Sequence, residues 1–234
     1  MAMGMRLLGC IQAWICASTT EVDAVRSMRW LVKPAFFLLC LSPALWLAGA
    51  IVLALKGGPN VLGPDPAQFL ALETGKWAMW MLIAALAVSP LRFLLNAPYL
   101  WKLRRMGGLF ALFYVNLHFL VFLALLLEWR WQELGREVAE RPYVTIGMLA
   151  FVLLIPLGMT SLQFAQRKMG RRWKQLHRMV YVVGILAVMH VVWIVRSSIG
   201  DALIYGMIMA ALLGYRLLRH LYPPLRSFSL RAAR

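Results

Sequence analysis

The chain has 234 residues, of which 62% are hydrophobic, and its mean hydropathy is +0.72. A water-soluble domain of this length cannot bury so much apolar surface, so part of its surface must face lipid. Only helices or a closed barrel can span a bilayer, and the long uncharged blocks lack the two-residue alternation of barrel strands. The composition therefore predicts an all-α integral membrane protein.

Basic residues dominate the charge, with 25 Lys and Arg against 9 Asp and Glu. In a soluble protein this balance would suggest binding to nucleic acid. Here the basic residues lie between the apolar blocks, where they control topology in the membrane. We therefore expect membrane lipid, and no nucleic acid, around this chain.

Residues 1–30 are predicted to be a cytoplasmic extension ahead of the membrane domain. Their apolar run, 7–17, is short for the core of a signal peptide and is interrupted by Gln12. We favour an unstructured extension before a start near Met28, and a signal peptide is the alternative.

Six apolar blocks follow, each close to the length of about 20 residues that crosses a bilayer. They predict one six-transmembrane-helix bundle over residues 31–222, with spans at about 34–55, 77–95, 106–127, 143–166, 178–195 and 202–219. The second and sixth are short, and arginines at their ends extend them by snorkelling. A basic tail, 223–234, follows, and the sequence shows neither an internal repeat nor a second domain.

The connecting segments contain further signals. The loop 57–67 is rich in Gly and Pro and is expected to be irregular. The loop 128–141 contains four glutamates in the pattern of a short amphipathic helix at the membrane interface. Gly107, Gly108 and Gly170 are expected to end helices.

The basic residues alternate between the two sides of the membrane. The N-terminal arm, the second and fourth loops and the C-terminal tail together hold 19 of the 25 lysines and arginines. Because basic loops stay in the cytoplasm, both termini are predicted to be cytoplasmic.

Almost all charged residues lie at the ends of the predicted spans, no acidic residue falls within one, and the ionisable residues expected deep inside are histidines. His118 lies 11 residues beyond Gly107, and His190 lies 13 residues beyond His177. At 1.5 Å per residue these are depths of roughly 17 and 20 Å, so the two rings can meet at one level. Two facing imidazoles without a nearby carboxylate suit haem iron ligated on both sides. For a single membrane histidine, an interhelical hydrogen bond is the alternative.

His177, at the cytoplasmic mouth of the fifth span, is a candidate ligand for a second haem. On a straight helix, however, a step of 13 residues turns its ring almost to the opposite face from that of His190, so a bulge or a tilted haem is needed. The third span has Arg104 and Arg105 instead of a histidine at this level. His220 could be the opposite ligand, although we favour a solvated tail residue.

Other chemistries have little support. The absence of acidic residues in the predicted spans argues against an ion-coupled transporter. The sequence has no HExxH, no GxSxG and no glycine-rich phosphate loop. The 14 methionines are scattered among leucines and are interpreted as packing residues.

Several short motifs resemble those of one family of membrane proteins. They are, in chain order, Glu73-Thr-Gly, Ser89-Pro-Leu, Arg104-Arg105, Leu117-His118, Arg141-Pro-Tyr-Val-Thr-Ile-Gly, Thr160-Ser-Leu-Gln, and the segment from Gln166 to Tyr181, followed by His190 and Trp193. Through them the chain, from about Met28 to Leu225, resembles the MsrQ family. These proteins are haem-binding membrane subunits of the periplasmic methionine-sulfoxide reductase system and are related to ferric reductases. His220 and the arm before Met28 match no motif of the family.

The resemblance implies a ferric reductase-like protein of the bacterial inner membrane with one or two haems b. The family's haem histidines correspond to His118, His177 and His190, whose imidazoles would be axial ligands of the iron. Electrons would come from the quinone pool or from a cytosolic flavin reductase, and FMN is associated with the family. They would pass to a periplasmic molybdopterin reductase of the MsrP type, which carries out the reduction of methionine sulfoxide itself.

Three functions are compatible with these observations. The first is an electron-transfer subunit without substrate chemistry of its own. The second is a free-standing transmembrane reductase of the ferric-reductase type, acting on a small external acceptor. The third is a transporter or assembly scaffold in which the histidines only pack. Within the first, the acidic loop 128–141 is expected to help dock the partner, and the basic cluster 167–174 is a candidate site for an anionic flavin or lipid headgroups.

Overall fold

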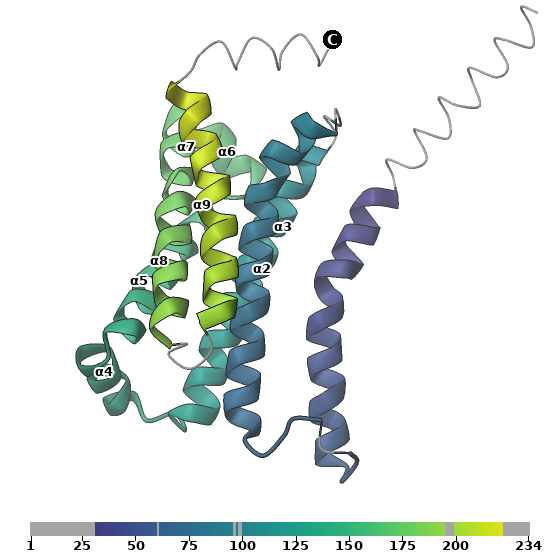
Figure 1. Ribbon diagram of the computed structural model, residues 1–234, viewed down its shortest axis with the longest axis vertical. Coiled ribbons are helices and arrows are strands. Elements are labelled where there is room, and N and C mark those ends of the chain that lie inside the picture. The colour runs from purple at the N-terminus through teal and green to yellow at the C-terminus, as the bar shows by residue number, and fades with distance from the viewer. Residues whose placement is uncertain (1–30, 60, 96, 98–99, 195–198, 222–234) are drawn as a thin grey trace, which may run out of the picture. The chain divides into compact units, whose positions relative to one another are not determined.

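The computed structural model describes residues 31–221, apart from residues 60, 96, 98–99 and 195–198 (Figure 1). The predicted extension 1–30 and the basic tail 223–234 lie outside these described residues. The chain divides into two compact units, 1–42 and 43–234. The first unit contributes the beginning of the helix Leu31–Leu55, and the second contains every other described element.

The described residues form helices and connecting turns, without strands, so the all-α prediction is confirmed. After the helix Leu31–Leu55, the elements are α2 (Pro66–Leu94), α3 (Trp101–Val121), the π-helix η2 (Phe122–Leu126), α4 (Trp131–Glu140), α5 (Pro142–Met159), α6 (Gln163–Met169), α7 (Arg171–His177), α8 (Met179–Ile194) and α9 (Ile199–Leu221). Six stretches of the described chain are long and apolar enough to cross a membrane, as the sequence predicted.

The second span begins at Pro66 and not at Trp77, so the predicted boundary is wrong by three turns. Asp65 caps the helix, because its side chain accepts a hydrogen bond of 3.0 Å from the backbone N–H of Gln68. Within α2, Glu73 and Lys76 form an ion pair of 2.9 Å. An acidic residue therefore does lie within a candidate span, against the expectation from the sequence.

The fourth predicted span, 143–166, is also wrong at its end, because α5 stops at Met159. The hydroxyls of Thr160 and Ser161 donate to the carbonyls of Pro156 and Leu157, at 2.6 and 2.7 Å, and so satisfy the end of the helix. The short helix α6 follows, and Gly170 separates it from α7 with a φ of 52°. Gly170 thus ends a helix as predicted.

Gly107 and Gly108 lie within α3, so the prediction that they end a helix is wrong. A Cβ at Gly107 would lie 3.3 Å from the Cα and Cβ of Ala85 on α2. The missing side chain therefore lets α2 and α3 approach closely, a common use of glycine between membrane helices.

Five helices of the second unit pack in a ring (Figure 1). The helix α2 packs on α3, α3 on α5, α5 on α8, α8 on α9, and α9 packs back on α2. The amphipathic α4, predicted from the acidic loop, packs against α5 at one end of the ring. Many leucine and valine side chains on the outside of the ring are exposed, as expected for helices that face lipid.

Candidate functional site: a histidine pair between two helices

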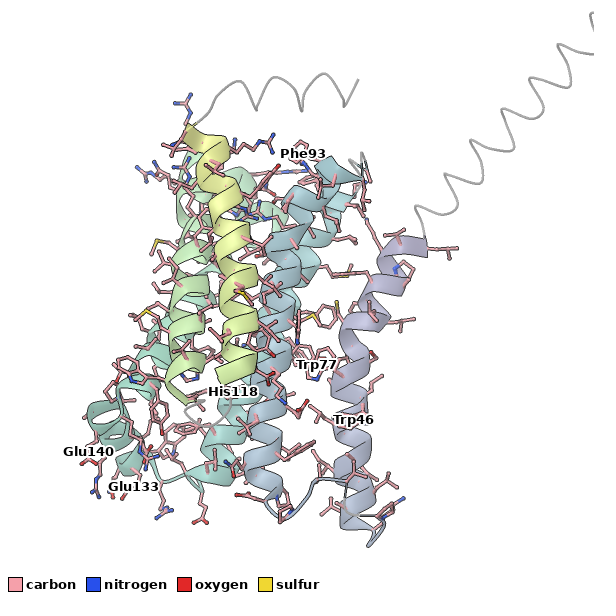
Figure 2. The ribbon with its side chains drawn as sticks, in the orientation of Figure 1. Trp46, Trp77, Phe93, His118, Glu133 and Glu140 are labelled. Atoms are coloured by element: carbon pink, nitrogen blue, oxygen red, sulfur yellow. The ribbon has the colours of Figure 1, made fainter. Side chains whose placement is uncertain are left out.

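His118 of α3 and His190 of α8 lie side by side inside the ring. Their ring centroids are 6.3 Å apart, and the ring planes are nearly perpendicular at 83°. The prediction that the two rings meet at one level is therefore confirmed. Figure 2 shows His118 in the part of the bundle toward α4, which carries Glu133 and Glu140, and away from Phe93 at the opposite end.

Each ring is held through Nδ1 by a backbone carbonyl. His118 Nδ1 is 2.9 Å from the carbonyl oxygen of Ala71 on α2, and His190 Nδ1 is 2.7 Å from that of Tyr143 on α5. A carbonyl can only accept, so each Nδ1 carries the proton and donates it. The lone pair of a neutral imidazole then lies on Nε2, which is free to bind a metal.

Glycines lie against both histidine rings. A Cβ at Gly147 would lie 2.7 Å from Cε1 and Nδ1 of His190, a shorter distance than Cβ atoms keep from neighbouring atoms in proteins. A Cβ at Gly75 would lie 3.3 Å from Nδ1 of His118. The hydroxyl of Thr74, which is 1% exposed, also lies 3.4 Å from this Nδ1. The helices α2 and α5 thus hold the two rings in place at their Nδ1 sides, α2 for His118 and α5 for His190.

The two halves of the site form an internal repeat. The set of Ala71, Gly75 and His118 recurs 72 residues later as Tyr143, Gly147 and His190. In both halves the carbonyl lies one helical turn before the glycine, and the histidine follows on the partner helix. The sequence prediction that the chain has no internal repeat is therefore wrong at this level.

The pair can hold one metal but cannot complete its coordination. Imidazole nitrogens bind a first-row metal at about 2 Å, and the ring centre lies about 1 Å behind the nitrogen, so two rings sharing a metal are roughly 6 Å apart. The observed 6.3 Å fits this value. Among the described residues no group of three or more His, Cys, Asp or Glu could hold a metal ion. A cofactor that brings its own equatorial ligands, such as haem, therefore fits the site.

His177 lies apart from this pair, at the end of α7. Its ring stacks on Trp173 at 4.0 Å, and its Nδ1 is 3.2 Å from the Trp173 carbonyl oxygen. The Leu157 carbonyl lies near the ring, but Nε2 is buried and has no hydrogen-bond partner among the described residues. The helix is interrupted between α7 and α8 at Arg178, although Arg178 keeps helical backbone angles (φ −69°, ψ −23°) and the span Arg171–Ile194 runs through it.

His220 lies in the last turn of α9, and not in a tail as expected from the sequence, and its side chain is exposed. Among the described residues, the ring that stacks on His177 is that of Trp173, and no ring contact joins His177 to another histidine. An opposite ligand from His220 stays a prediction.

The acidic loop is largely neutralised by its own arginines. Arg130 pairs with Glu128 at 3.6 Å, and the other two pairs are Arg136 with Glu140 at 2.9 Å and Arg141 with Glu137 at 3.1 Å. Glu133 has no ion pair among the described residues. At the opposite end of the bundle, a shallow pocket is lined by Lys168, Met169, Arg171 and Arg172.

The fold and the site define a helical membrane protein that can hold a metal-containing cofactor between its helices. Residues 70–188 match the family described as ferric reductase like transmembrane component. This segment contains His118 and His177 and ends two residues before His190.

Similar proteins narrow this class. The chain is 40% identical to the protein-methionine-sulfoxide reductase heme-binding subunit MsrQ of Bordetella pertussis, over 75% of this chain and 88% of that protein. It is 38% identical to the protein of the same name from Xanthomonas campestris pv. campestris, over 81% of this chain and 87% of that protein. The chain belongs to the MsrQ family. No solved structure matches it.

Sequence reasoning identified the histidines but not the groups that hold them. Ala71 and Tyr143 contribute only their carbonyl oxygens, and Gly75 and Gly147 contribute the absence of a side chain. The signal was available only as motifs, since Glu73-Thr-Gly and Arg141-Pro-Tyr-Val-Thr-Ile-Gly contain both glycines and Tyr143.

Proposed function

We propose that this protein is a haem b subunit that carries electrons across the bacterial inner membrane to a periplasmic molybdopterin methionine-sulfoxide reductase. The observation that supports it best is the His118–His190 pair, with both Nδ1 atoms bonded to carbonyls and the rings spaced for a shared metal. The names of the relatives, heme-binding subunits of a protein-methionine-sulfoxide reductase, support the same function.

In this proposal His118 and His190 would hold the haem iron through their Nε2 atoms. The haem supplies a one-electron carrier in a region without water. The chain's own contribution is orientation: the carbonyls of Ala71 and Tyr143 fix the rings and make the imidazoles better electron donors. The site lies toward α4, at the end that the positive-inside rule assigns to the periplasm, so electrons leave toward a soluble partner.

A second haem at His177 is part of the proposal. Its support is the buried Nε2, which has no hydrogen-bond partner among the described residues and is the atom that a metal would need. With this haem, electrons would enter at the cytoplasmic end from the quinone pool or a cytosolic flavin reductase. The pocket lined by Lys168, Arg171 and Arg172 is suited to an anionic FMN or to lipid headgroups.

The first test is a reduced-minus-oxidised spectrum with haem quantitation on the purified wild type and three alanine variants. We expect His118→Ala and His190→Ala each to lose the same haem, because removing either ligand opens one iron site. His177→Ala is expected to lose a different haem. A colourless, well-folded wild type made in haem-replete cells would overturn the proposal.

A free-standing ferric reductase-like activity is the second candidate, favoured by the family match over residues 70–188. The two functions differ in the electron acceptor. The reduced protein should lose electrons faster to a cognate periplasmic reductase than to ferric chelates if it is a dedicated subunit. The reverse order of rates would support the ferric reductase function.

A further inference from the structure

Arg216 fastens α9 to α2 at the end of the bundle opposite α4. Its Nη2 donates to the carbonyl oxygen of Leu86 at 2.7 Å and to the hydroxyl oxygen of Ser89 at 3.1 Å. The Leu86 carbonyl needs this donor because residue 90, four positions on, is a proline without a backbone N–H. One side of the guanidinium therefore has a structural role.

On the other side of the guanidinium, Tyr181 interacts with the group but leaves Nη1 without a hydrogen bond. Tyr181 contacts the group with its ring, 4.8 Å from the guanidinium carbon, and with its hydroxyl nearby. Nη1 is nevertheless buried without a hydrogen-bond partner among the described residues. A buried, charged donor without an acceptor is costly, so an acceptor that belongs to a ligand is the simplest way to satisfy it.

The same part of the bundle contains the other unsatisfied atom. In the described chain, Nε2 of His177 and Nη1 of Arg216 are the buried side-chain nitrogens without a hydrogen-bond partner. Tyr181, which contacts Arg216, lies four residues after His177. Arg104 lies close enough to His177 and to Arg216 for its charge to act on both. One ligand that offers a metal to the histidine and an anionic oxygen to the arginine would satisfy both.

We propose that Arg216 binds a propionate carboxylate of the haem whose iron is ligated by His177. The inference rests on the second haem of the proposed function. Because Nη2 is already bonded to Leu86 and Ser89, Nη1 is the nitrogen available to a carboxylate oxygen, and hydrogen bonds between charged groups are the strong ones. Arg216 is thus a cofactor-binding residue as well as the link between α9 and α2.

Two substitutions separate charge from structure. Arg216→Gln keeps an N–H donor for the Leu86 carbonyl and removes the positive charge, whereas Arg216→Lys keeps the charge and loses the fork. Ser89→Ala is the matched control, because it removes a partner of Nη2 and leaves Nη1 untouched.

The measurement is haem content with a redox titration of each haem. In Arg216→Gln we expect the haem that is lost in His177→Ala to bind about tenfold more weakly. The midpoint potential of this haem should also fall, because a nearby positive charge favours the reduced state. Arg216→Lys should retain most of the potential, and Ser89→Ala and the His118–His190 haem should be unchanged. If the affinity for this haem and its midpoint potential in Arg216→Gln equal those of the wild type, the inference is wrong, but the proposal of a second haem is unaffected.

Reconstitution with haem dimethyl ester, in which both carboxylates are blocked, identifies the anion. The wild type should bind the ester about tenfold more weakly than haem at the His177 site, and Arg216→Gln should bind both equally. If the wild type does not discriminate, the acceptor of Nη1 is another anion, such as a flavin or lipid phosphate, and the inference is wrong. If His177→Ala keeps the full haem count, the second haem and this inference fail together.

Discussion

At the scale of single residues, the site depends on side chains that are absent. A Cβ at Gly147 would lie 2.7 Å from the His190 ring, and one at Gly75 would lie 3.3 Å from the His118 ring. We expect Gly147→Ala to displace His190 and to weaken haem binding about tenfold, since overpacking costs roughly 1–3 kcal/mol. Gly75→Ala should have a smaller effect, because the ring there needs to move only a few tenths of an ångström. Haem titration of the apoprotein measures both.

Gly108 provides the control for these glycines, since a Cβ there would meet nothing within 4 Å and the residue also lies within a helix. Gly108→Ala should leave haem binding unchanged, while helix propensity favours the folded state by up to about 1 kcal/mol. Equal losses of haem in Gly108→Ala and Gly147→Ala would show that contact with the histidine ring is not the cause.

Thr74 competes with His118 for one carbonyl. Its single hydroxyl proton is shared between the carbonyls of Leu70 and Ala71, at 2.7 and 3.1 Å, and the Ala71 carbonyl also accepts from His118. In Thr74→Val the Ala71 carbonyl is left to the histidine, whose hydrogen bond should strengthen and make the imidazole a better donor to iron. We expect full haem content and a lower midpoint potential for this haem. Thr74→Ser retains the hydroxyl, so a shift of the same size in Thr74→Ser would contradict the explanation.

At the scale of helices, hydropathy predicted the number of spans but not all of their limits. Charges decided the predicted ends, and the prediction failed for α2, where Glu73 and Lys76 satisfy each other within the helix. It failed again after Met159, where hydroxyls end α5 although the sequence stays apolar. Such short-range pairings depend on side-chain geometry, which a hydropathy pattern does not contain.

The ion pairs of α4 change what the acidic loop can contribute to docking. Three of its four glutamates face arginines of the same segment, so its field toward a partner is weak, and Glu133 is left as the local negative charge. If a partner docks on this residue, Glu133→Lys should slow electron delivery and reduce its salt dependence more than Glu140→Lys, which changes the charge equally. Stopped-flow oxidation at several ionic strengths compares the two. Equal effects would indicate steering by net charge, and unchanged rates in both would exclude a docking role.

At the scale of the whole molecule, the histidine pair follows from a repeat that the sequence hardly shows. The spacing of 72 residues links Ala71 to Tyr143, Gly75 to Gly147 and His118 to His190, so only the glycines and histidines are identical in type. A backbone carbonyl places no demand on its own side chain, which explains why Ala and Tyr can serve the same purpose. Depth counting along the helices found the histidines, and only the packing of α2 and α5 could reveal their supports.

The repeat does not extend to His177, because the residue 72 positions earlier is Arg105 on α3 and not a histidine; the arginine whose charge acts on His177 is its neighbour Arg104. Fourteen residues of an unbroken helix make about 3.9 turns, so Arg104 lies on nearly the same face of α3 as His118. Arg105, one residue on, is turned away by about 100°. On the other side, α7 ends at His177 and α8 begins at Met179, with one irregular helical residue, Arg178, between them.

Arg104→His should therefore place an imidazole opposite His177 and complete a second bis-histidine site. If the proposed second haem is bound at His177, we expect it to gain a second imidazole ligand and become low-spin, seen as a second low-spin signal in electron paramagnetic resonance. Arg105→His makes the same substitution on a different face of α3, so its electron paramagnetic resonance spectrum should resemble that of the wild type. The double variant Arg104→His, His177→Ala should lose the new signal, because the new imidazole needs the old one across the iron. A signal that survives in the double variant would mean that the two positions do not face each other.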